Sequence, residues 1–297
     1  MMQENNIITC NLMGGLGNQL FQICATIVHG MRTGRKIVFP DIDVINVGTS
    51  RPTYWDDFLS GIKTLTRPPD YIANHKFTNY NENSFHYSDI TVPKTMCNLR
   101  MNGYFQSYKY FDSKKDVLFK IMKIREQQEA VSMQFFSYFD ASYNNIAMHF
   151  RLGDYKEIQN YHPLMPYQYY ENSLAHILSQ KTGRYRVLYF NQEEDNMLVS
   201  EYIYKLKTRF PDVLFMKVDD KIPDWKQLLI MSCADDNIIA NSTFSWWGAY
   251  FNERPRKIVC YPELWFGPAL NHDVRDLFIE SWTCVPLGGT PGSLNNA

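Results

Sequence analysis

The stretch NIAMHFRLGDY, residues 145–155, decides the fold that we predict for this chain. Residues 145–150 have the pattern of a buried strand, and a polar run follows them directly. Further on, helices are expected at 167–181, 194–208, 224–233 and 243–252, and strands at 185–190, 213–218, 237–240 and 257–261. Strands that are separated by helices indicate a parallel sheet with crossover connections, so the predicted fold class is α/β.

A second α/β pattern opens the chain. Its predicted elements are a strand at 7–12, a tight turn GGLGN, a helix at 18–33 closed by Gly34 and a strand at 36–39. Residues 41–112 are rich in proline, asparagine and tyrosine, which indicates long loops and short elements where an acceptor surface can be built. A long helix is expected over 114–139.

We therefore predict two α/β lobes, at 1–142 and 143–285, with a ligand cleft between them. The length of 297 residues also leaves open a single large α/β domain. Residues 286–297 are rich in glycine, proline, serine and asparagine, and we expect a flexible tail without fold content.

Composition and charge exclude several classes of protein. Hydrophobic residues make up 45% of the chain and charged residues 21%, as in a well-folded globular protein. The formal net charge of −1 gives no field of one sign, so we expect no nucleic-acid partner. The six dispersed cysteines predict neither disulfides nor zinc. No signal or membrane-spanning segment is evident, so we expect a cytoplasmic protein without a transmembrane segment.

The first motif is MGGLGNQLFQ, residues 13–22, between a predicted strand and a helix. Its glycines let the backbone approach a ligand, and the helix behind them offers free N–H groups. Leu20 replaces the last glycine of a dinucleotide fingerprint, and the Gly-Lys-Ser/Thr of a P-loop is missing. A plain strand-to-helix turn explains the motif equally well.

The second motif is HFRLGDY, residues 149–155, at the carboxyl end of the predicted strand. That end of a parallel sheet faces the ligand crevice, so His149, Arg151 and Asp154 are expected where a substrate lies. The planar fork of an arginine suits a diphosphate. The alternative is a structural ion pair between Arg151 and Asp154.

The third motif is IIANSTFSWWGAYF, residues 238–251. Asn241, Ser242 and Thr243 precede a predicted helix, where hydroxyls and free N–H groups form a neutral cradle for an anion. Ordinary N-capping of the helix is the alternative. Trp246 and Trp247 are predicted as core residues, not as platforms for a sugar.

Four motifs, GGLGNQLFQ (14–22), NGYFQSYKYF (102–111), HFRLGDY (149–155) and NIIANSTFSWWGAYF (237–251), together resemble glycosyltransferase family 11, the α-1,2-fucosyltransferases. The resemblance covers roughly residues 7 to 262. It implies an inverting, metal-independent enzyme of two-lobed GT-B-like architecture, with a donor-binding parallel sheet in the C-terminal half and an acceptor-binding N-terminal lobe. The implied donor is GDP-β-L-fucose, with no cofactor, and the implied acceptor is a galactoside hydroxyl of a glycan.

The resemblance also implies roles for single residues. Arg151 would hold the donor diphosphate, and Asn18 would lie at the cleft between the lobes. The full donor-binding set is Gly15, Gly17, Asn18, His149, Arg151, Gln227, Asn241, Ser242, Thr243 and Ser245. Two positions depart from the family pattern: Leu152 stands where many members have a second arginine, and Gln227 stands where members often have an acidic residue.

The expected reaction is direct displacement at the anomeric carbon as GDP leaves, with Arg151 stabilising the charge on the leaving phosphate. Asp154, Glu157 and His149 are the candidate general bases, and the sequence does not rank them. A transferase for another deoxyhexose or linkage, and a noncatalytic glycan-binding remnant, remain as alternatives. A bacterial or viral-type enzyme fits the absence of an anchor. The acceptor glycan and the oligomeric state are not specified by the sequence.

Overall fold

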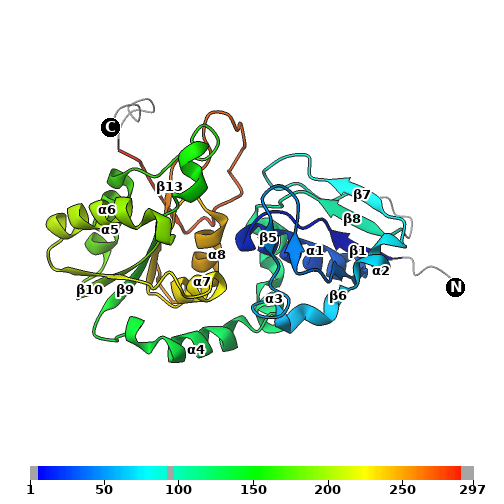
Figure 1. Cartoon of the computed structure of the whole chain (residues 1–297), viewed down its shortest axis with the longest axis horizontal. Coiled ribbons are helices and arrows are strands. Elements are labelled where there is room, and N and C mark those ends of the chain that lie inside the picture. Colours follow the sequence, from blue (N-terminus) through cyan, green and yellow to red (C-terminus); the bar gives the residue numbers. More distant parts are fainter. Residues whose placement is uncertain (1–5, 92–96, 289–297) are drawn as a thin grey trace. The chain divides into compact units, whose positions relative to one another are not determined.

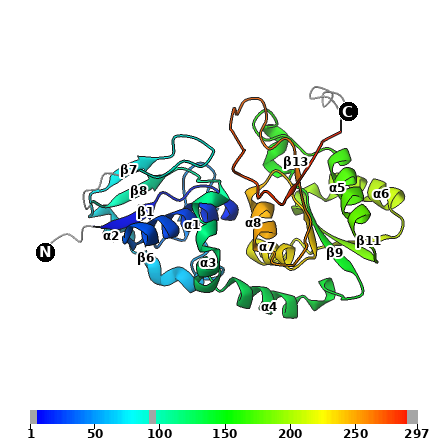
Figure 2. The same ribbon diagram turned by 180° about the vertical axis from the view of Figure 1, so that it is seen from behind.

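A computed structural model describes residues 6–91 and 97–288 of the chain (Figures 1 and 2). The chain divides into two compact units. Unit 1 is Met1–Glu126 with His272–Ile279, and unit 2 is Gln127–Asn271 with Glu280–Ala297. Each unit has an α/β architecture with its own parallel sheet.

The first boundary between the units lies at Glu126–Gln127, upstream of the predicted 142–143. The reason is helix α4 (Ile124–Gln134), most of which packs with unit 2. Gln128 Nε2 in this helix donates to Ser232 Oγ (2.9 Å) and to the carbonyl of Phe251 (3.0 Å).

The start of the predicted tail is anchored in unit 2. Leu287 is buried, and its N–H donates to Glu263 Oε1 at 2.8 Å. The predicted boundary of the flexible tail, residue 286, therefore lies before the end of the ordered contacts of unit 2. Residues 289–297 of the predicted tail lie outside the described part of the chain.

Unit 1 is built on a four-stranded parallel sheet with the order β2-β1-β8-β7. The strands are β1 (Ile7–Cys10), β2 (Lys36–Ile37), β7 (Thr78–Asn81) and β8 (Leu99–Asn102), joined by the short strands β3 (Phe39–Pro40), β4 (Val44–Ile45), β5 (Arg51–Pro52) and β6 (Thr66–Arg67). The helices are α1 (Leu16–Thr33), α2 (Pro69–Ala73) and α3 (Lys115–Ile121). Gly34 closes α1 in the left-handed conformation (φ 63°), which confirms the predicted end of this helix.

One prediction for unit 1 was incomplete, and one for the following segment was wrong. The 41–112 stretch contains short elements, as predicted, but it was not foreseen that two of them, β7 and β8, are strands of the main sheet and that β8 pairs with β1. The long helix predicted over 114–139 is two helices, because Lys123 (φ 56°) takes the left-handed conformation between α3 and α4.

Unit 2 contains a six-stranded parallel sheet with the order β11-β10-β9-β12-β13-β14. The strands are β9 (Asn144–His149), β10 (Tyr185–Phe190), β11 (Val213–Lys217), β12 (Asp236–Ile238), β13 (Val259–Pro262) and β14 (Thr283–Val285). The helices after α4 are α5 (Tyr167–Gln180), α6 (Asn196–Arg209), α7 (Asp224–Ser232) and α8 (Thr243–Phe251). Helices α5 and α6 cover one face of the sheet, and α7 and α8 cover the other (Figures 1 and 2). The predicted alternation of strands and helices is confirmed; only β14 was not foreseen.

Aromatic residues fill much of the core of unit 2. Trp246 and Trp247 on α8 are completely buried, which confirms that neither is a platform for a sugar. The Trp246 ring stacks on Tyr250, with 5.0 Å between ring centroids, and Trp247 lies edge-on to the same ring at 5.2 Å.

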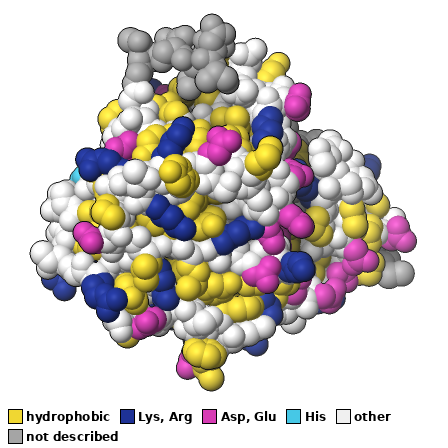
Figure 3. Space-filling view, turned by 60° about the vertical axis from the view of Figure 1, so that its left-hand side comes forward, with side chains coloured by type: hydrophobic (Ala, Val, Ile, Leu, Met, Phe, Trp, Pro, Cys, Tyr) yellow, Lys and Arg dark blue, Asp and Glu magenta, His cyan; other side chains and the backbone are white. Residues whose placement is uncertain are grey.

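Over the left and centre of the face seen in Figure 3, lysine and arginine side chains are spread among hydrophobic and acidic ones, and acidic side chains are more frequent at the right. Within residues 6–91 and 97–288, no helix is both long enough and apolar enough to span a membrane.

We expect Trp247→Ala to lower the free energy of unfolding by about 3–5 kcal/mol, because it opens a cavity in the core beside Tyr250 and Phe251. Urea unfolding followed by circular dichroism measures the change. Tyr204→Ala on α6, where the side chain is 73% exposed, is the matched control and should stay within about 0.5 kcal/mol of the native protein. Equal losses for both variants would contradict this description of the core.

Candidate functional site

The topology of unit 2 brings three loops to one edge of its sheet. The chain adds β10 and then β11 on one side of β9, and then returns to place β12 and its successors on the other side. The order of the strands therefore reverses between β9 and β12, and ligands of open α/β sheets bind at such a point, outside the carboxyl ends of the strands. The loops that leave β9, β10 and β12 meet there.

Arg151 is the cation of this edge. Its Nη1 donates to Gln192 Oε1 at 2.6 Å, and its Nη2 pairs with Asp154 Oδ1. The guanidinium carbon lies 4.8 Å from the ring centroid of Tyr155. The ion pair with Asp154, which the sequence left open, is therefore present.

This ion pair is easily exchanged. The Asp154 side chain is 53% exposed and that of Arg151 is 19% exposed, so water reaches the pair from the side of the carboxylate and screens it there. Gln192, the second partner, is neutral. A phosphate can therefore replace Asp154 at little cost in lost attraction between Arg151 and Asp154, and it can form a bidentate contact with the guanidinium.

Sequence reasoning missed Gln192, although it stands only two residues after the predicted strand 185–190. Gly153 (φ 35°) makes room for it: a Cβ at this position would lie 2.4 Å from Gln192 Oε1. Gly153 is itself held by Asp195, whose Oδ2 accepts its N–H at 2.9 Å and whose Oδ1 accepts from Lys156 Nζ at 2.6 Å. The loop of the HFRLGDY motif is thus fixed to the loop that follows β10.

His149 ends β9 and is almost entirely buried. Its Nδ1 has no hydrogen-bond partner among the described residues, and its ring lies 5.6 Å from that of Phe244. Burial, together with the charge of Arg151, lowers the pKa of His149 to about 3. The imidazole is therefore neutral at physiological pH, and its low basicity makes it a poor general base.

The start of α8 supplies the third wall of the site. Ser242 caps the helix, with its Oγ accepting from the N–H of Phe244 at 3.4 Å, and Ser245 Oγ donates to the carbonyl of Ser242 at 3.3 Å. Both hydroxyls thus bond to the backbone, as in ordinary capping, and Thr243 follows at the first helical position, half-buried. An anion at this wall would therefore be bound mainly by the free N–H groups of the first turn of α8.

Asn241 connects this wall to Arg151. Its Nδ2 donates to the carbonyls of Pro163 (2.9 Å) and Trp265 (3.3 Å), while its buried Oδ1 has no partner among the described residues. The hydroxyl of Tyr155, whose ring underlies Arg151, donates to the carbonyl of Asn241 at 3.4 Å. His149, Arg151, Asp154 and Asn241–Ser245 therefore lie near one another at this edge of the sheet.

Gln227 and Glu157 are the remaining predicted site residues of unit 2. Gln227 on α7 donates through Nε2 to the carbonyl of Ile222 (2.8 Å), so it holds its own loop. Glu157 is exposed at the end of the short 3-10 helix Gly153–Glu157. Among the described residues, no three or more His, Cys, Asp or Glu side chains are grouped as metal ligands.

The predicted residues of unit 1 lie at the start of α1. Gly15 is the N-cap, without a side-chain cap, and Gly17 is buried in the first turn. Asn18 Oδ1 accepts from Gln106 Nε2 at 3.0 Å, which ties the GGLGN turn to the NGYFQ segment. These two motifs of the sequence therefore form one local structure.

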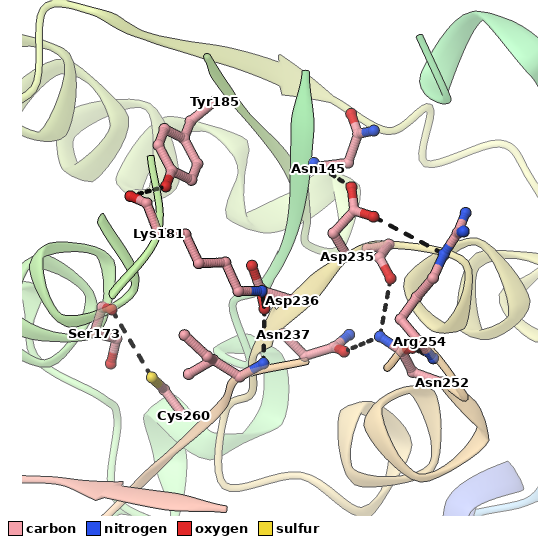
Figure 4. Close-up of polar contacts among 12 residues, drawn as sticks. Asn145, Ser173, Lys181, Tyr185, Asp235, Asp236, Asn237, Asn252, Arg254 and Cys260 are labelled. Carbon is pink, nitrogen blue, oxygen red and sulfur yellow. Dashed lines mark hydrogen bonds and ion pairs between the residues drawn. The ribbon is translucent and has the colours of Figure 1, made fainter. Parts of the chain in front are cut away.

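An acidic doublet at the opposite edge of the unit 2 sheet is structural (Figure 4). Asp236 is fully buried, with its Oδ1 accepting from Lys181 Nζ and from the N–H of Ile258. Asp235 Oδ2 accepts from the N–H of Asn145 at 2.8 Å. Acidic pairs of this kind usually lie in solvent. Here the two side chains form hydrogen bonds that connect β12 with β9 and with the residue before β13.

Comparison with known proteins gives the class of enzyme. No family model matches the chain. It is 27% identical to the O-antigen biosynthesis glycosyltransferase WbnK of Escherichia coli, over 91% of this chain and 98% of that protein. It is 25% identical to the alpha-1,2-colitosyltransferase of Escherichia coli, over 88% of this chain and 93% of that protein. The comparisons support a glycosyltransferase.

A solved structure supports the fold. NodZ alpha-1,6-fucosyltransferase, co-crystallised with GDP, matches with a TM-score of 0.52 and 12% identity, over 86% of this chain and 94% of that one. The α/β, GT-B-like architecture with a parallel sheet in the C-terminal half, which the sequence predicted, is confirmed.

The burial of His149 predicts a pH dependence of stability. Its pKa is lowered from 6.5 to about 3, so its contribution is complete above pH 6.5 and is lost as the pH falls toward 3. We expect His149→Asn to lose less stability than the native protein between pH 7 and pH 5, by about 1–2 kcal/mol. Urea midpoints at both pH values measure the difference, and parallel losses in the two proteins would contradict the assignment.

Proposed function

We propose that this protein transfers L-fucose from GDP-β-L-fucose to a hydroxyl of a galactoside, in α-1,2 linkage, with inversion and without a metal ion. The observation that carries the proposal is Arg151 at the carboxyl edge of the unit 2 sheet, paired with an exposed and exchangeable carboxylate. Unit 2 binds the donor in this proposal, and unit 1 binds the acceptor.

The donor diphosphate replaces Asp154 at the guanidinium of Arg151. The first turn of α8, capped by Ser242, supplies N–H groups to the same phosphates. Negative charge grows on the leaving phosphate as the sugar departs, and fixed donors directed at that charge stabilise the transition state. Gly15, Gly17 and Asn18, at the start of α1 in unit 1, remain predicted donor-binding residues.

Buried polar atoms without partners also support a bound ligand at this edge. Asn241 Oδ1 is an acceptor, and Nδ1 of the neutral His149 accepts or donates according to its tautomer; neither atom has a hydrogen bond among the described residues. Buried polar atoms are rarely left without a partner, so hydroxyl or N–H groups of a nucleotide sugar are suitable partners for them.

The identity of the sugar has one specific alternative. A relative over most of the chain is named as a colitosyltransferase, and it shares the α-1,2 linkage with the proposal. Colitose is also a deoxyhexose, so the same diphosphate site would serve GDP-colitose. A noncatalytic glycan-binding remnant is the further alternative, and it predicts no release of GDP.

The first experiment mixes the protein, with EDTA present, with GDP-fucose and a panel of β-galactosides, and measures GDP release and product mass. Arg151→Ala should lower kcat by about 10²–10³-fold, because the charge on the leaving phosphate loses its fixed counter-charge. Arg184→Ala, which removes an exposed arginine from the same unit, is the matched control and should retain activity.

If GDP is released from GDP-colitose and not from GDP-fucose, the transferred sugar in the proposal becomes colitose. Release that stops with EDTA would contradict metal independence. No release from either donor would overturn the transferase.

Asp154→Asn separates two roles of this carboxylate. If Asp154 only competes for Arg151, the variant binds GDP more tightly and keeps its kcat. If Asp154 is the general base, kcat falls by about 10²–10⁴-fold. We expect the first result, with Glu157 as the remaining candidate base in unit 2, and isothermal titration with GDP beside steady-state kinetics measures both quantities.

A further inference from the structure

The carboxyl edge of the unit 1 sheet carries a row of three asparagines that the donor site does not use. Asn81 and Asn102 are the last residues of β7 and β8 and are paired in register, and Asn11 follows the last residue of β1, which pairs with the residue before Asn102. Asn11 Nδ2 donates to Asn102 Oδ1 at 2.6 Å, and Asn102 Nδ2 donates to Asn81 Oδ1 at 2.9 Å. Asn11 and Asn81, at the two ends of the row, are exposed.

The row lies where the topology of unit 1 reverses. From β1 the chain adds β2 on one side, and it then returns to place β7 and β8 on the other side of β1. The hydrogen bond between Asn11 and Asn102 spans this reversal, outside the carboxyl ends of the strands. In open parallel sheets, this is the place at which ligands bind.

The chemistry of the row favours hydroxyl groups over anions. Each amide has two donor hydrogens and two acceptor lone pairs, and the bonds within the row leave part of this capacity exposed. Glu82 follows Asn81 directly, and its acidic side chain offers a phosphate no positive charge. Arg100, two residues before Asn102, lies over the ring of Phe77, 4.6 Å from its centroid. A neutral ligand with many hydroxyls fits this edge best.

An exposed aromatic residue follows the row closely in the sequence. Tyr104 follows Asn102 after Gly103 and is 39% exposed. Glu82 Oε2 accepts the N–H groups of Tyr104 (2.8 Å) and Phe105 (3.0 Å), and it holds Phe105 in the left-handed conformation (φ 52°) with its ring fully buried. Such a conformation costs about 1 kcal/mol or more for a residue with a side chain, so these contacts fix the segment that carries Tyr104.

Resting on the proposed function, we infer that Asn11, Asn81, Asn102 and Tyr104 form the subsite for the acceptor saccharide. The amides bind sugar hydroxyls, and the Tyr104 ring covers an apolar face of the sugar. Glu82 is a positioning residue that fixes the segment of Tyr104.

The test first measures sugar binding without any donor, by saturation-transfer NMR with lactose and methyl β-galactoside. Asn81→Ala, Asn11→Ala and Tyr104→Ala should each weaken binding by about 5- to 10-fold, the loss expected for one hydrogen bond or one ring contact. Asn46→Ala, which removes an exposed asparagine elsewhere in unit 1, is the matched control and should bind as the native protein does. Thermal unfolding of each variant identifies any that fails to fold.

A second measurement separates this subsite from the donor site. The affinity for GDP, from isothermal titration, should stay within about twofold of the native value in the three variants, while the KM for the acceptor rises by the same factor as the loss of binding. Glu82→Gln keeps the shape of the carboxylate and should retain the KM for the acceptor, whereas Glu82→Ala should raise it.

Three results would overturn the inference. The first is that all three variants bind the sugars as tightly as the native protein does. The second is a loss of GDP affinity equal to the loss of sugar affinity. The third is that the native protein shows no saturation transfer to either sugar. Absence of GDP release from the native protein would instead count against the proposed reaction, because the binding measurement needs no donor.

Discussion

The structure depends on the parallel pairing of β9 with two neighbours, β10 on one side and β12 on the other. Because all three strands run in the same direction, their carboxyl ends meet at one edge. The HFRLGDY loop, Gln192 and the start of α8 come from distant parts of the chain, and this pairing alone places them together. The buried Asp236, fastened to Lys181 and to β13, supports the same pairing from the opposite edge.

The electrostatics of the donor site follow from burial. His149 is neutral because the protein interior disfavours its charged form, and the positive charge of Arg151 adds to the effect. The guanidinium of Arg151 has a half-exposed carboxylate as its partner. A cation with an exchangeable partner is suited to a diphosphate leaving group.

The two units repeat one structural principle with different chemistry. In both, the order of the strands reverses beside a central parallel strand, and polar residues stand at the carboxyl ends on either side of the reversal. Unit 2 places an arginine and a helix start at this point, and unit 1 places neutral amides and a tyrosine. The first set suits phosphates and the second suits hydroxyl groups, as the two substrates of a glycosyl transfer would require.

The sequence by itself determined the fold of unit 2, because the lengths and periods of its helices and strands are local properties. It also determined the polar motifs at the strand ends, the end of α1 at Gly34 and the burial of Trp246 and Trp247. Only the tertiary structure decided that β7 and β8 are strands, since pairing with β1 and not local pattern makes them so. It alone revealed Gln192 beside Arg151 and the row of asparagines, because contacts between residues far apart in sequence leave no periodic signal in any one segment.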